Sequence, residues 1–287
     1  MTPVTLHAIS QVDFETFTTA FNLAYSDYYV SISMSVPTFR ALIARDDLNL
    51  DASVAALDGN QIVGTGLLGI RGQQGWIGGM GVIPDRRRQG IGRQMMHYLL
   101  DRAREHGLTQ VNLEVIEANT GAYALYRQLG FEDIRFLHCL DRDPAQLGDE
   151  MLPYQIELHP AGQLLAYYPD YHPIPNCWQR SGPSLMALAH HLHGWAVLDP
   201  AMGDGTIAGY AVGVANEYDV RLLDFAVNPT TDQRNVALAL LMHLHRQFPA
   251  AHGTSYNIAA GDPVMPAYDR LGYITTFRQI EMQLFIR

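Results

Sequence analysis

The chain contains no lysine: all 19 of its basic residues are arginine, against 29 acidic residues. The resulting net charge of -10 excludes a general nucleic-acid-binding protein, which needs a basic face. The two cysteines, Cys139 and Cys177, form no CxxC pair, so we expect neither a disulfide framework nor a metal site. No stretch of about 18 residues is apolar enough to suggest a membrane span.

What is present suffices for two packed domains. The chain has 287 residues, of which 48% are hydrophobic, and its length suits two domains better than one. Its first residues include acids and no long apolar run, unlike a signal peptide. We therefore expect a cytoplasmic protein, monomeric or homodimeric, with no membrane or nucleic-acid partner.

Three short segments recur in the same order in the second half of the chain. The pairs are 62–64 with 207–209, 82–84 with 227–229, and 126–131 with 268–273. The nearly constant offset indicates a tandem duplication. We predict two copies of one fold, residues 1–143 and 144–287, joined by a linker at about 141–175 that is rich in proline and tyrosine.

Hydrophobic periodicity in the first copy predicts a mixed α+β domain. Helices are expected at 13–24, 37–45, 92–106 and 120–129, and strands at 53–57, 61–70, 75–82, 110–116 and 134–140. The helix at 92–106 is amphipathic, with an apolar face made by Met95, Met96, Leu99, Leu100 and Ala103.

The most informative segment joins the strand at 75–82 to the helix at 92–106. It reads Arg87-Arg88-Gln89-Gly90-Ile91-Gly92-Arg93. Glycine lets the backbone approach a ligand, and the unpaired N–H groups at a helix start attract anions. The arginines add charge for phosphate oxygens. Because no GK[ST] follows and GxGxxG is incomplete, the segment is neither a Walker loop nor a Rossmann fingerprint. It predicts a pyrophosphate site.

This segment resembles the R/Q-x-x-G-x-G/A motif of the GCN5-related N-acetyltransferase (GNAT) superfamily. The strand Leu113-Glu114-Val115, Asn119, a short helix with Tyr126, and the sequence at 129–131 resemble its second signature, so the resemblance covers roughly residues 50–140. It implies a tandem GNAT fold, in which each copy has a mostly antiparallel, splayed central sheet flanked by helices. It also implies acetyl-CoA as the cofactor.

The resemblance also implies where the cofactor binds. Pantetheine would lie between the strand that ends at Val82 and the strand that contains Glu114, and bond to the backbone near Met80 much as an added strand does. The residues implied to bind the cofactor are Met80, Gly81, Val82, Arg87, Arg88, Gln89, Gly90, Ile91, Gly92, Arg93, Asn119 and Tyr126.

Two residues are candidates for proton transfer. Tyr126 stands where the family places the general acid that protonates the departing thiolate; a core tyrosine is the alternative. Glu114 matches the base proposed in the ribosomal-protein alanine N-acetyltransferases; an ion-paired carboxylate is the alternative. The strand at 76–82 carries no carboxylate, unlike that of many relatives, which leaves Glu114 or water alone as the base.

The tyrosine-rich segment after the first helix lies where the family binds the acceptor. Tyr25, Asp27, Tyr28 and Tyr29 offer a negative charge and ring faces, which would hold a cationic amine. A packing surface is the alternative.

The second copy departs from the motif. Asn235 stands in place of Gly90, and Asp232 in place of Arg87, so a side chain and a negative charge would oppose phosphate binding. We interpret this copy as structural, although Tyr268 is retained.

Two other segments of the second copy stand out. His190, His191 and His193 are expected on an ordinary helix face rather than at a metal. Residues 177–180 are a candidate cap over the acceptor cleft.

The leading hypothesis is therefore an N-acetyltransferase that moves the acetyl group of acetyl-CoA to a primary amine of a small molecule, by direct attack in a ternary complex. Two alternatives stay open: a non-catalytic acyl-CoA sensor, and a protein N-terminal acetyltransferase. Nothing in the sequence identifies the acceptor amine or the acyl length.

Overall fold

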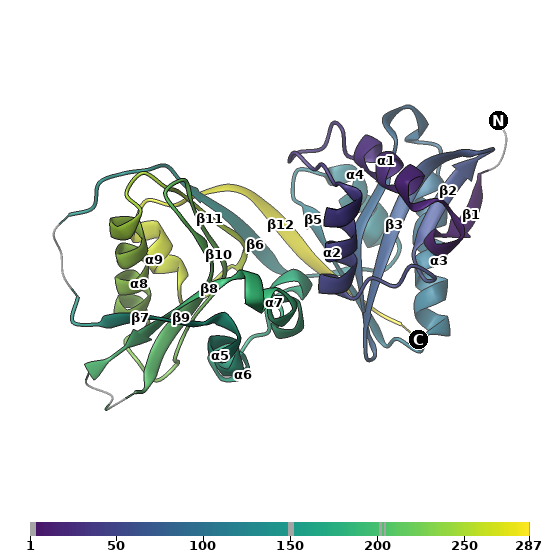
Figure 1. Cartoon of the computed structure of the whole chain (residues 1–287). Helices are drawn as coiled ribbons and strands as arrows, with labels where there is room; N and C mark the ends of the chain where they lie inside the picture. Colours follow the sequence, from purple (N-terminus) through teal and green to yellow (C-terminus); the bar gives the residue numbers. More distant parts are fainter. Residues whose placement is uncertain (1–3, 149–151, 201–202, 204, 287) are drawn as a thin grey trace. The chain divides into compact units, whose positions relative to one another are not determined.

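The computed structural model describes residues 4–148, 152–200, 203 and 205–286. The chain forms two compact units (Figure 1): unit 1 is Met1–Ile134 with Ile280–Arg287, and unit 2 is Arg135–Gln279. These bounds differ from the predicted division at residue 143. The reason is that two long strands, β6 (Glu132–Arg142) and β12 (Ile274–Phe285), each begin in one unit and end in the other.

Every helix and strand predicted for the first copy is present, with ends within two residues, and all of them except β6 lie in unit 1. Its elements are β1 (Thr5–Ala8), α1 (Phe14–Ala24), α2 (Val36–Asp46), β2 (Val54–Asp58), β3 (Gln61–Arg71), β4 (Gln74–Val82), η2 (Pro84–Arg86), α3 (Ile91–Glu105), β5 (Gln110–Ile116) and α4 (Thr120–Gln128). The strands lie in the order β1-β2-β3-β4-β5, with the end of β12 beyond β5. β1 pairs with β2, β2 with β3, and β3 with β4, all antiparallel, and β4 pairs parallel to β5.

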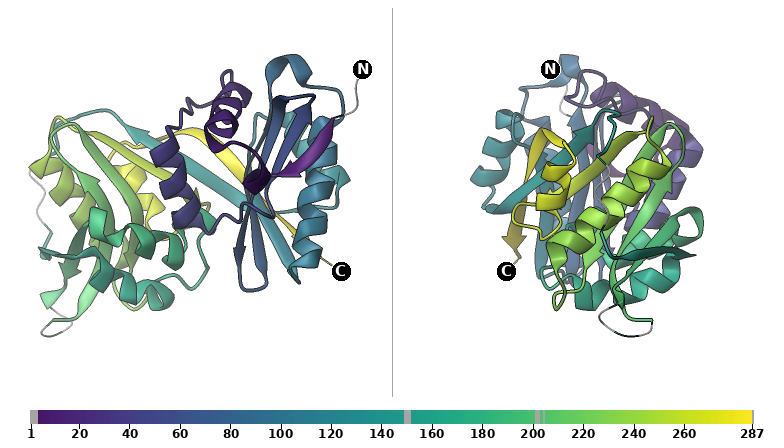
Figure 2. Two further views of the ribbon diagram at one scale, coloured as in Figure 1. Left: turned by 45° about the vertical axis from the view of Figure 1, so that its right-hand side comes forward. Right: turned by 90° about the vertical axis from the view of Figure 1, so that its left-hand side faces the viewer.

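Local sequence explains why the helices of unit 1 begin where they do. The Asp13 side chain caps α1, and the Ser35 side chain caps α2; both residue types satisfy the first free N–H groups of a helix. The apolar face predicted for α3 is fully buried against the sheet. α1 packs on the opposite face of β3 and β4, so helices cover both faces of this sheet (Figure 2).

Unit 2 repeats this plan. Its elements are β7 (Gln155–Pro160), α5 (Ala161–Leu164), α6 (Tyr168–Tyr171), η4 (Trp178–Arg180), α7 (Gly182–Leu188), η5 (Ala189–His191), β8 (His193–Leu198), β9 (Ile207–Ala215), β10 (Asp219–Val227), α8 (Gln233–Gln247), β11 (His252–Ala259) and α9 (Met265–Arg270). Its strands follow the order β12-β6-β11-β10-β9-β8-β7. The apolar residues of α8 form the centre of its largest core.

The segment predicted as a linker, 141–175, is largely structured. It contains the end of β6, all of β7, and the short helices α5 and α6. β7 pairs antiparallel with β8 and therefore forms part of the sheet of unit 2. Residues 149–151 of this segment lie outside the described residues.

The two units keep the same strand register, which confirms the duplication. In unit 1 the parallel pairing joins residues 74–77 to 110–113, and in unit 2 it joins 219–222 to 252–255. These positions are related by the same offsets as the sequence repeats. A bulge follows at equivalent places, Gly78 and Leu223. Beyond these four pairs the two parallel strands diverge, so each unit has a splayed sheet.

Across the described part of the chain, no helix has both the length and the apolar character that a membrane crossing needs.

Candidate functional site

The gap between the diverging strands β4 and β5 is the centre of the candidate site. Parallel pairing ends at Ile77 and Leu113. A Cβ on Gly78 would lie 2.1 Å from a ring atom of Trp76, so only glycine fits there. The Trp76 indole Nε1–H donates to Oε2 of Glu114 at 2.7 Å. Trp76 therefore fixes the orientation of Glu114 where the gap begins.

The loop from β4 to α3 has the backbone of an anion site. Arg88 and Gly90 both have positive φ, of 62° and 81°. An arginine in this region is strained, and strain of this kind concentrates at functional sites. Alternation of such residues with ordinary ones lets successive N–H groups converge on an anion. Gly90 is the N-cap of α3 and offers no side-chain cap, so the first amides of the helix stay open to a ligand.

Gly90 and Gly92 are glycine for different physical reasons. Gly90 is required by its left-handed backbone. Gly92 is not required by the fold, because a Cβ there would meet Leu125 at 3.7 Å and Met80 at 3.9 Å, which are ordinary contacts. A ligand that approaches the backbone would explain the glycine, so the loop fits a pyrophosphate.

Arg87 and Asp27, predicted to bind different ligands, bind each other. The guanidinium donates to the two Asp27 carboxylate oxygens at 2.8 and 2.6 Å, and to the carbonyls of Val82 and Ala24 at 3.0 and 3.1 Å. The ion pair lowers the pKa of Asp27 and raises the pKa of Arg87. Arg87 thus ties the anion loop to the end of α1, a role that no sequence spacing indicated.

The other predicted loop side chains lie around the start of α3. Arg93 donates to Gln128 of α4, and the Gln89 amide donates weakly, at 3.4 Å, to the Asp85 carbonyl. The Arg88 guanidinium extends toward Gly121 of α4. The loop therefore presents arginines both on α3 and toward α4.

Tyr126 is buried beside the tyrosine-rich segment that was predicted to bind the acceptor. Its side chain is 7% exposed, and burial together with the nearby Tyr28 raises its pKa. The hydroxyl consequently keeps its proton at neutral and mildly alkaline pH. Tyr28 lies close to Asn119, and Asn119 caps α4 by accepting from the Ala122 N–H. The predicted acid, acceptor and cofactor residues are therefore neighbours.

Two more tyrosines complete this cluster. The Tyr29 hydroxyl donates to the Ala118 carbonyl at 3.0 Å. Tyr25, 8% exposed, packs on β4, where its hydroxyl oxygen lies 3.3 Å from the position of a Cβ on Gly79. Burial raises the pKa of Tyr25, and the nearby Tyr28 and Tyr126 raise it further. The tyrosine-rich segment is thus both a packing surface and a lining of the gap.

Comparison with known proteins gives a family match for part of the chain. Residues 14–131 match the model of the acetyltransferase (GNAT) family, which is less than half of the chain. The whole chain is similar to the tandem GNAT protein from the clavulanic acid biosynthesis pathway, at 16% identity with a TM-score of 0.71 over 99% of both chains. It is also similar to a GCN5-related N-acetyltransferase from Sphaerobacter thermophilus, at 15% identity and a TM-score of 0.74, covering 100% of this chain and 98% of that one.

At these identities the solved structures show the fold alone, and it is the predicted tandem GNAT fold. A shorter likeness is stronger in sequence. The chain is 42% identical over 52 residues to the [ribosomal protein bS18]-alanine N-acetyltransferase of Escherichia coli K12. The match covers 18% of this chain and 35% of that protein.

In unit 2 the strands β10 and β11 also diverge, as β4 and β5 do in unit 1. The side chain of Arg180 bonds to both strands there. Arg180, 5% exposed, donates from Nε to the Leu223 carbonyl of β10 at 2.9 Å and from Nη1 to the Asn257 carbonyl of β11 at 3.2 Å. Its Nη2 donates to Asp224 at 3.2 Å. The candidate cap at 177–180 therefore contributes an arginine to the interior of unit 2.

Asp224 accepts a hydrogen bond from Arg180. It is a residue of this network that the sequence analysis did not identify. It is fully buried within the apolar strand β10, where a carboxylate requires partners. It accepts hydrogen bonds from His172, Tyr210 and Asn176 at 3.0, 2.9 and 3.2 Å. Burial alone would raise its pKa, but the charges and hydrogen bonds around it hold the pKa below its ordinary value.

The helix that follows β10 in unit 2 is also closed to anions. Asp232 caps α8 by accepting from the backbone N–H of Asn235 at 3.2 Å, and the Asn235 side chain donates to the same carboxylate at 2.8 Å. The GNAT motif positions of this unit thus bond to each other.

The remaining candidate features of unit 2 carry no reactive geometry. His190 and His191 lie in η5 while His193 starts β8, so the expected helix face is wrong. In the described ranges no three His, Cys, Asp or Glu side chains are placed to hold a metal.

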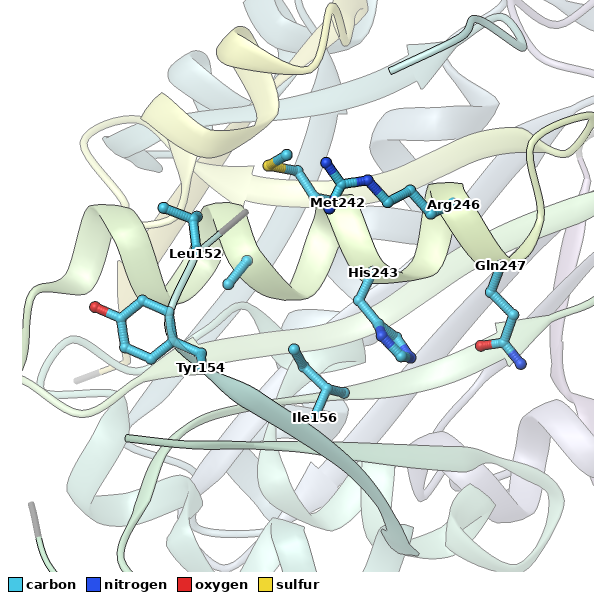
Figure 3. A pocket seen from close by; sticks show the side chains of 8 residues that line it. Leu152, Tyr154, Ile156, Met242, His243, Arg246 and Gln247 are labelled. Carbon is cyan, nitrogen blue, oxygen red and sulfur yellow. The ribbon is translucent and has the colours of Figure 1, made fainter. Parts of the chain in front are cut away.

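A pocket of about 400 Å³ between β7 and α8 (Figure 3) is lined mostly by apolar side chains, with His243 and Arg246 at one side.

Proposed function

We propose that unit 1 transfers the acetyl group of acetyl-CoA to a primary amine of a small molecule, by direct attack of the amine. The observation that carries this proposal is the splayed gap of unit 1, where β4 loses its parallel partner after Ile77 and the buried Tyr126 lies near Tyr25, which packs on β4. The match of residues 14–131 to the GNAT family model supports it.

In this proposal, residues of unit 1 bind each part of acetyl-CoA. The open amides from Gly90 to Arg93 and the arginines Arg88 and Arg93 hold the pyrophosphate. The backbone of Met80 to Val82 and the side chain of Asn119 hold the pantetheine arm. Acetyl-CoA supplies an acyl group activated as a thioester. Arg87 acts indirectly, because its contacts fix the loop to α1.

Tyr126 and Glu114 move the protons. As the amine nitrogen bonds to the acyl carbon and the C–S bond breaks, Tyr126 donates its proton to the departing sulfur. Glu114, oriented by Trp76, accepts through water the proton that the amine gives up. Glu114 then releases its proton to solvent and Tyr126 takes one from solvent, so the sum of the reaction is an amide and a free thiol.

The test is thiol release from acetyl-CoA across a panel of small amines, with cofactor binding measured in parallel by calorimetry. Turnover of at least one small amine is expected. Cofactor binding without turnover of any amine or peptide would contradict catalysis and favour an acyl-CoA sensor.

A second candidate acceptor is a protein N-terminus. The 42% identity over 52 residues to an enzyme that acetylates the alanine of ribosomal protein bS18 favours it. The same assay separates the two classes when it includes short peptides beginning with alanine. Turnover confined to the peptides would replace the small-molecule proposal.

We further propose that unit 2 binds no cofactor, so that each chain binds one. Arg180 bonds to both diverging strands of that unit, and Asp232 already caps the helix start. Calorimetry of the whole chain with acetyl-CoA is expected to give one site. Two sites would contradict this assignment.

A further inference from the structure

The tyrosine-rich segment lies in a loop whose two ends are bonded together. Asn22, near the end of α1, donates from its side-chain amide to the Met34 carbonyl at 2.9 Å, and its side-chain oxygen accepts from the Met34 N–H at 2.8 Å. A loop whose ends are held together in this way is compact, and such loops are frequently functional. We call residues 25–33, which this contact encloses, the tyrosine loop.

Arg87 holds the tyrosine loop on the side of β4. Its Nε donates to the carbonyl of Val82, the last residue of β4, while its two Nη groups donate to the Ala24 carbonyl and to both carboxylate oxygens of Asp27. A bidentate arginine–carboxylate pair fixes geometry as well as adding strength. Because all three nitrogens have acceptors here, the charge of Arg87 is paired within the protein before any phosphate arrives.

Tyr29 holds the same loop on the side of β5. Its hydroxyl donates to the Ala118 carbonyl at 3.0 Å, just beyond the end of β5 at Ile116. Parallel pairing of the two strands ends at Ile77 and Leu113, so both attachments lie past the point where the strands diverge. The tyrosine loop therefore spans the gap, from the end of β4 to the end of β5.

The rings of the loop form one surface across this span. A Cβ on Gly81 would lie 3.2 Å from the Tyr25 ring, so glycine at this position lets the ring lie against β4. Tyr25 contacts Tyr28 edge to face, and Tyr28 contacts Tyr29 in the same way, with ring centroids 5.0 and 5.5 Å apart. On the proposed function, an amine that attacks a thioester in the gap meets this surface.

We propose that Arg87 and Asp27 are positioning residues for the acceptor amine, which hold the tyrosine loop across the gap, and that Arg87 is not a ligand of the cofactor's phosphates. The motif position of Arg87 would assign it to phosphate, but Asp27 binds its guanidinium instead. The phosphates are left to the amides at the start of α3 and to Arg88 and Arg93. Asp27 acts through Arg87 and does not touch the amine. This inference rests on the proposed function of unit 1.

The test compares the wild type with Asp27→Asn, Arg87→Gln and the double variant. Two quantities are measured: the KM of the small amine that the panel turns over fastest, and the calorimetric affinity for acetyl-CoA. Asp27→Asn is expected to raise the KM of the amine about three- to tenfold and to change the acetyl-CoA affinity less than about twofold. In the Arg87→Gln background the same change is expected to add nothing, because Asp27 then has no guanidinium to hold.

A second measurement needs no acceptor. Exchange of the amide hydrogens of the tyrosine loop, followed with acetyl-CoA bound, is expected to be faster in Asp27→Asn than in the wild type. The matched control is Asp101→Asn, which breaks an exposed ion pair with Arg104 at 2.8 Å on α3. It should alter neither the KM, nor the affinity, nor the exchange of the loop.

Three results would overturn the roles of Arg87 and Asp27 and leave the proposed function intact. Tighter binding of acetyl-CoA by Asp27→Asn would mean that the released Arg87 binds phosphate. A rise in KM that persists in the Arg87→Gln background would mean that Asp27 binds the amine directly. Unchanged KM or unchanged exchange of the loop would mean that the ion pair positions nothing. A chain that turns over no amine overturns the proposed function, and this inference with it.

Discussion

The two units share one splayed sheet design and fill it differently. In unit 1 the gap between β4 and β5 is lined by backbone amides and tyrosines, and α3 begins at an uncapped glycine. In unit 2 the gap between β10 and β11 holds the Arg180 guanidinium, and α8 begins at Asp232, which caps it. The strands thus diverge in both units because both share one register and one bulge. Whether a ligand can enter the gap depends on whether a side chain such as that of Arg180 already fills it.

The contrast also shows what a filled gap requires. A buried guanidinium loses its hydration, and this loss is offset only by full hydrogen bonding. Arg180 has two strand carbonyls and Asp224, and Asp224 has three further donors. Unit 2 therefore replaces a ligand from solution with a buried polar network.

The largest expected effect comes from emptying the gap of unit 2. Arg180→Ala leaves Asp224 without its buried cation, and the free energy of unfolding should fall by about 3–5 kcal/mol. Urea denaturation followed by the fluorescence of Trp178 and Trp195, in a Trp76→Phe background, reports this unit.

The matched control for Arg180→Ala is Arg221→Ala. Arg221 forms an exposed ion pair with Asp219 at 3.0 Å, and its loss should cost less than about 1 kcal/mol. Equal losses in the two variants would mean that Arg180 has no special role in the gap.

The next largest effect concerns Tyr126, the proposed general acid of unit 1. Tyr126→Phe should lower kcat roughly a hundred- to a thousandfold with little change in the calorimetric affinity for acetyl-CoA. The equivalent change in unit 2, Tyr268→Phe, should leave kcat unchanged. Because burial raises the pKa of Tyr126, the acid form persists and the wild-type rate should not fall between pH 7 and about 9. A fall in that range that Tyr126→Phe abolishes would contradict the raised pKa.

A third prediction concerns pH and the core of unit 2. Burial, with the nearby Arg142, lowers the pKa of His245 to about 4 from 6.5. Between these values the unfolded chain binds a proton that the folded chain does not, so stability falls as the pH is lowered from about 6.5 to 4, by up to about 3 kcal/mol.

The measurement is the free energy of unfolding of unit 2 from pH 7.5 to 4.5, for the wild type and His245→Gln. The variant loses the bond to the Tyr273 hydroxyl at 2.8 Å and should be less stable at pH 7.5, with a smaller dependence on pH. The same dependence in both proteins would assign it to other groups.

The smallest expected effect tests the anion loop. Gly92→Val places a side chain where a ligand would approach, and acetyl-CoA affinity should fall about tenfold or more. Since the protein leaves ordinary contact distances there, the melting temperature without cofactor should change little. Unchanged affinity would contradict the proposed pyrophosphate site.

The elements of unit 1 could be predicted because their causes are local. Caps such as Asp13 and Ser35, the apolar face of α3, and the glycines of the anion loop all lie within a few residues of what they determine. The second copy could be recognised because three short segments of the first copy recur in it in the same order.

What could not be predicted depends on partners far apart in the chain. Arg87 meets Asp27 across 60 positions, and Arg180 meets Asp224 across 44. No periodicity reports such pairs. Asp224 inside an apolar strand signals a buried partner but not which one. The bounds of the two units differ from the predicted division for the same reason. The sequence of a strand such as β6 or β12 does not show that its two ends lie in different units.

The passage of β12 from unit 2 into unit 1 has a consequence for biosynthesis. The outer partner of β5 is the end of β12, where the Ile286 N–H donates to the Thr109 carbonyl at 2.9 Å and Gln283 bonds Gln110 at 3.4 Å. These residues leave the ribosome after all of unit 2. The sheet that carries Glu114 is therefore completed last, and unit 1 cannot complete its fold before unit 2 has been made.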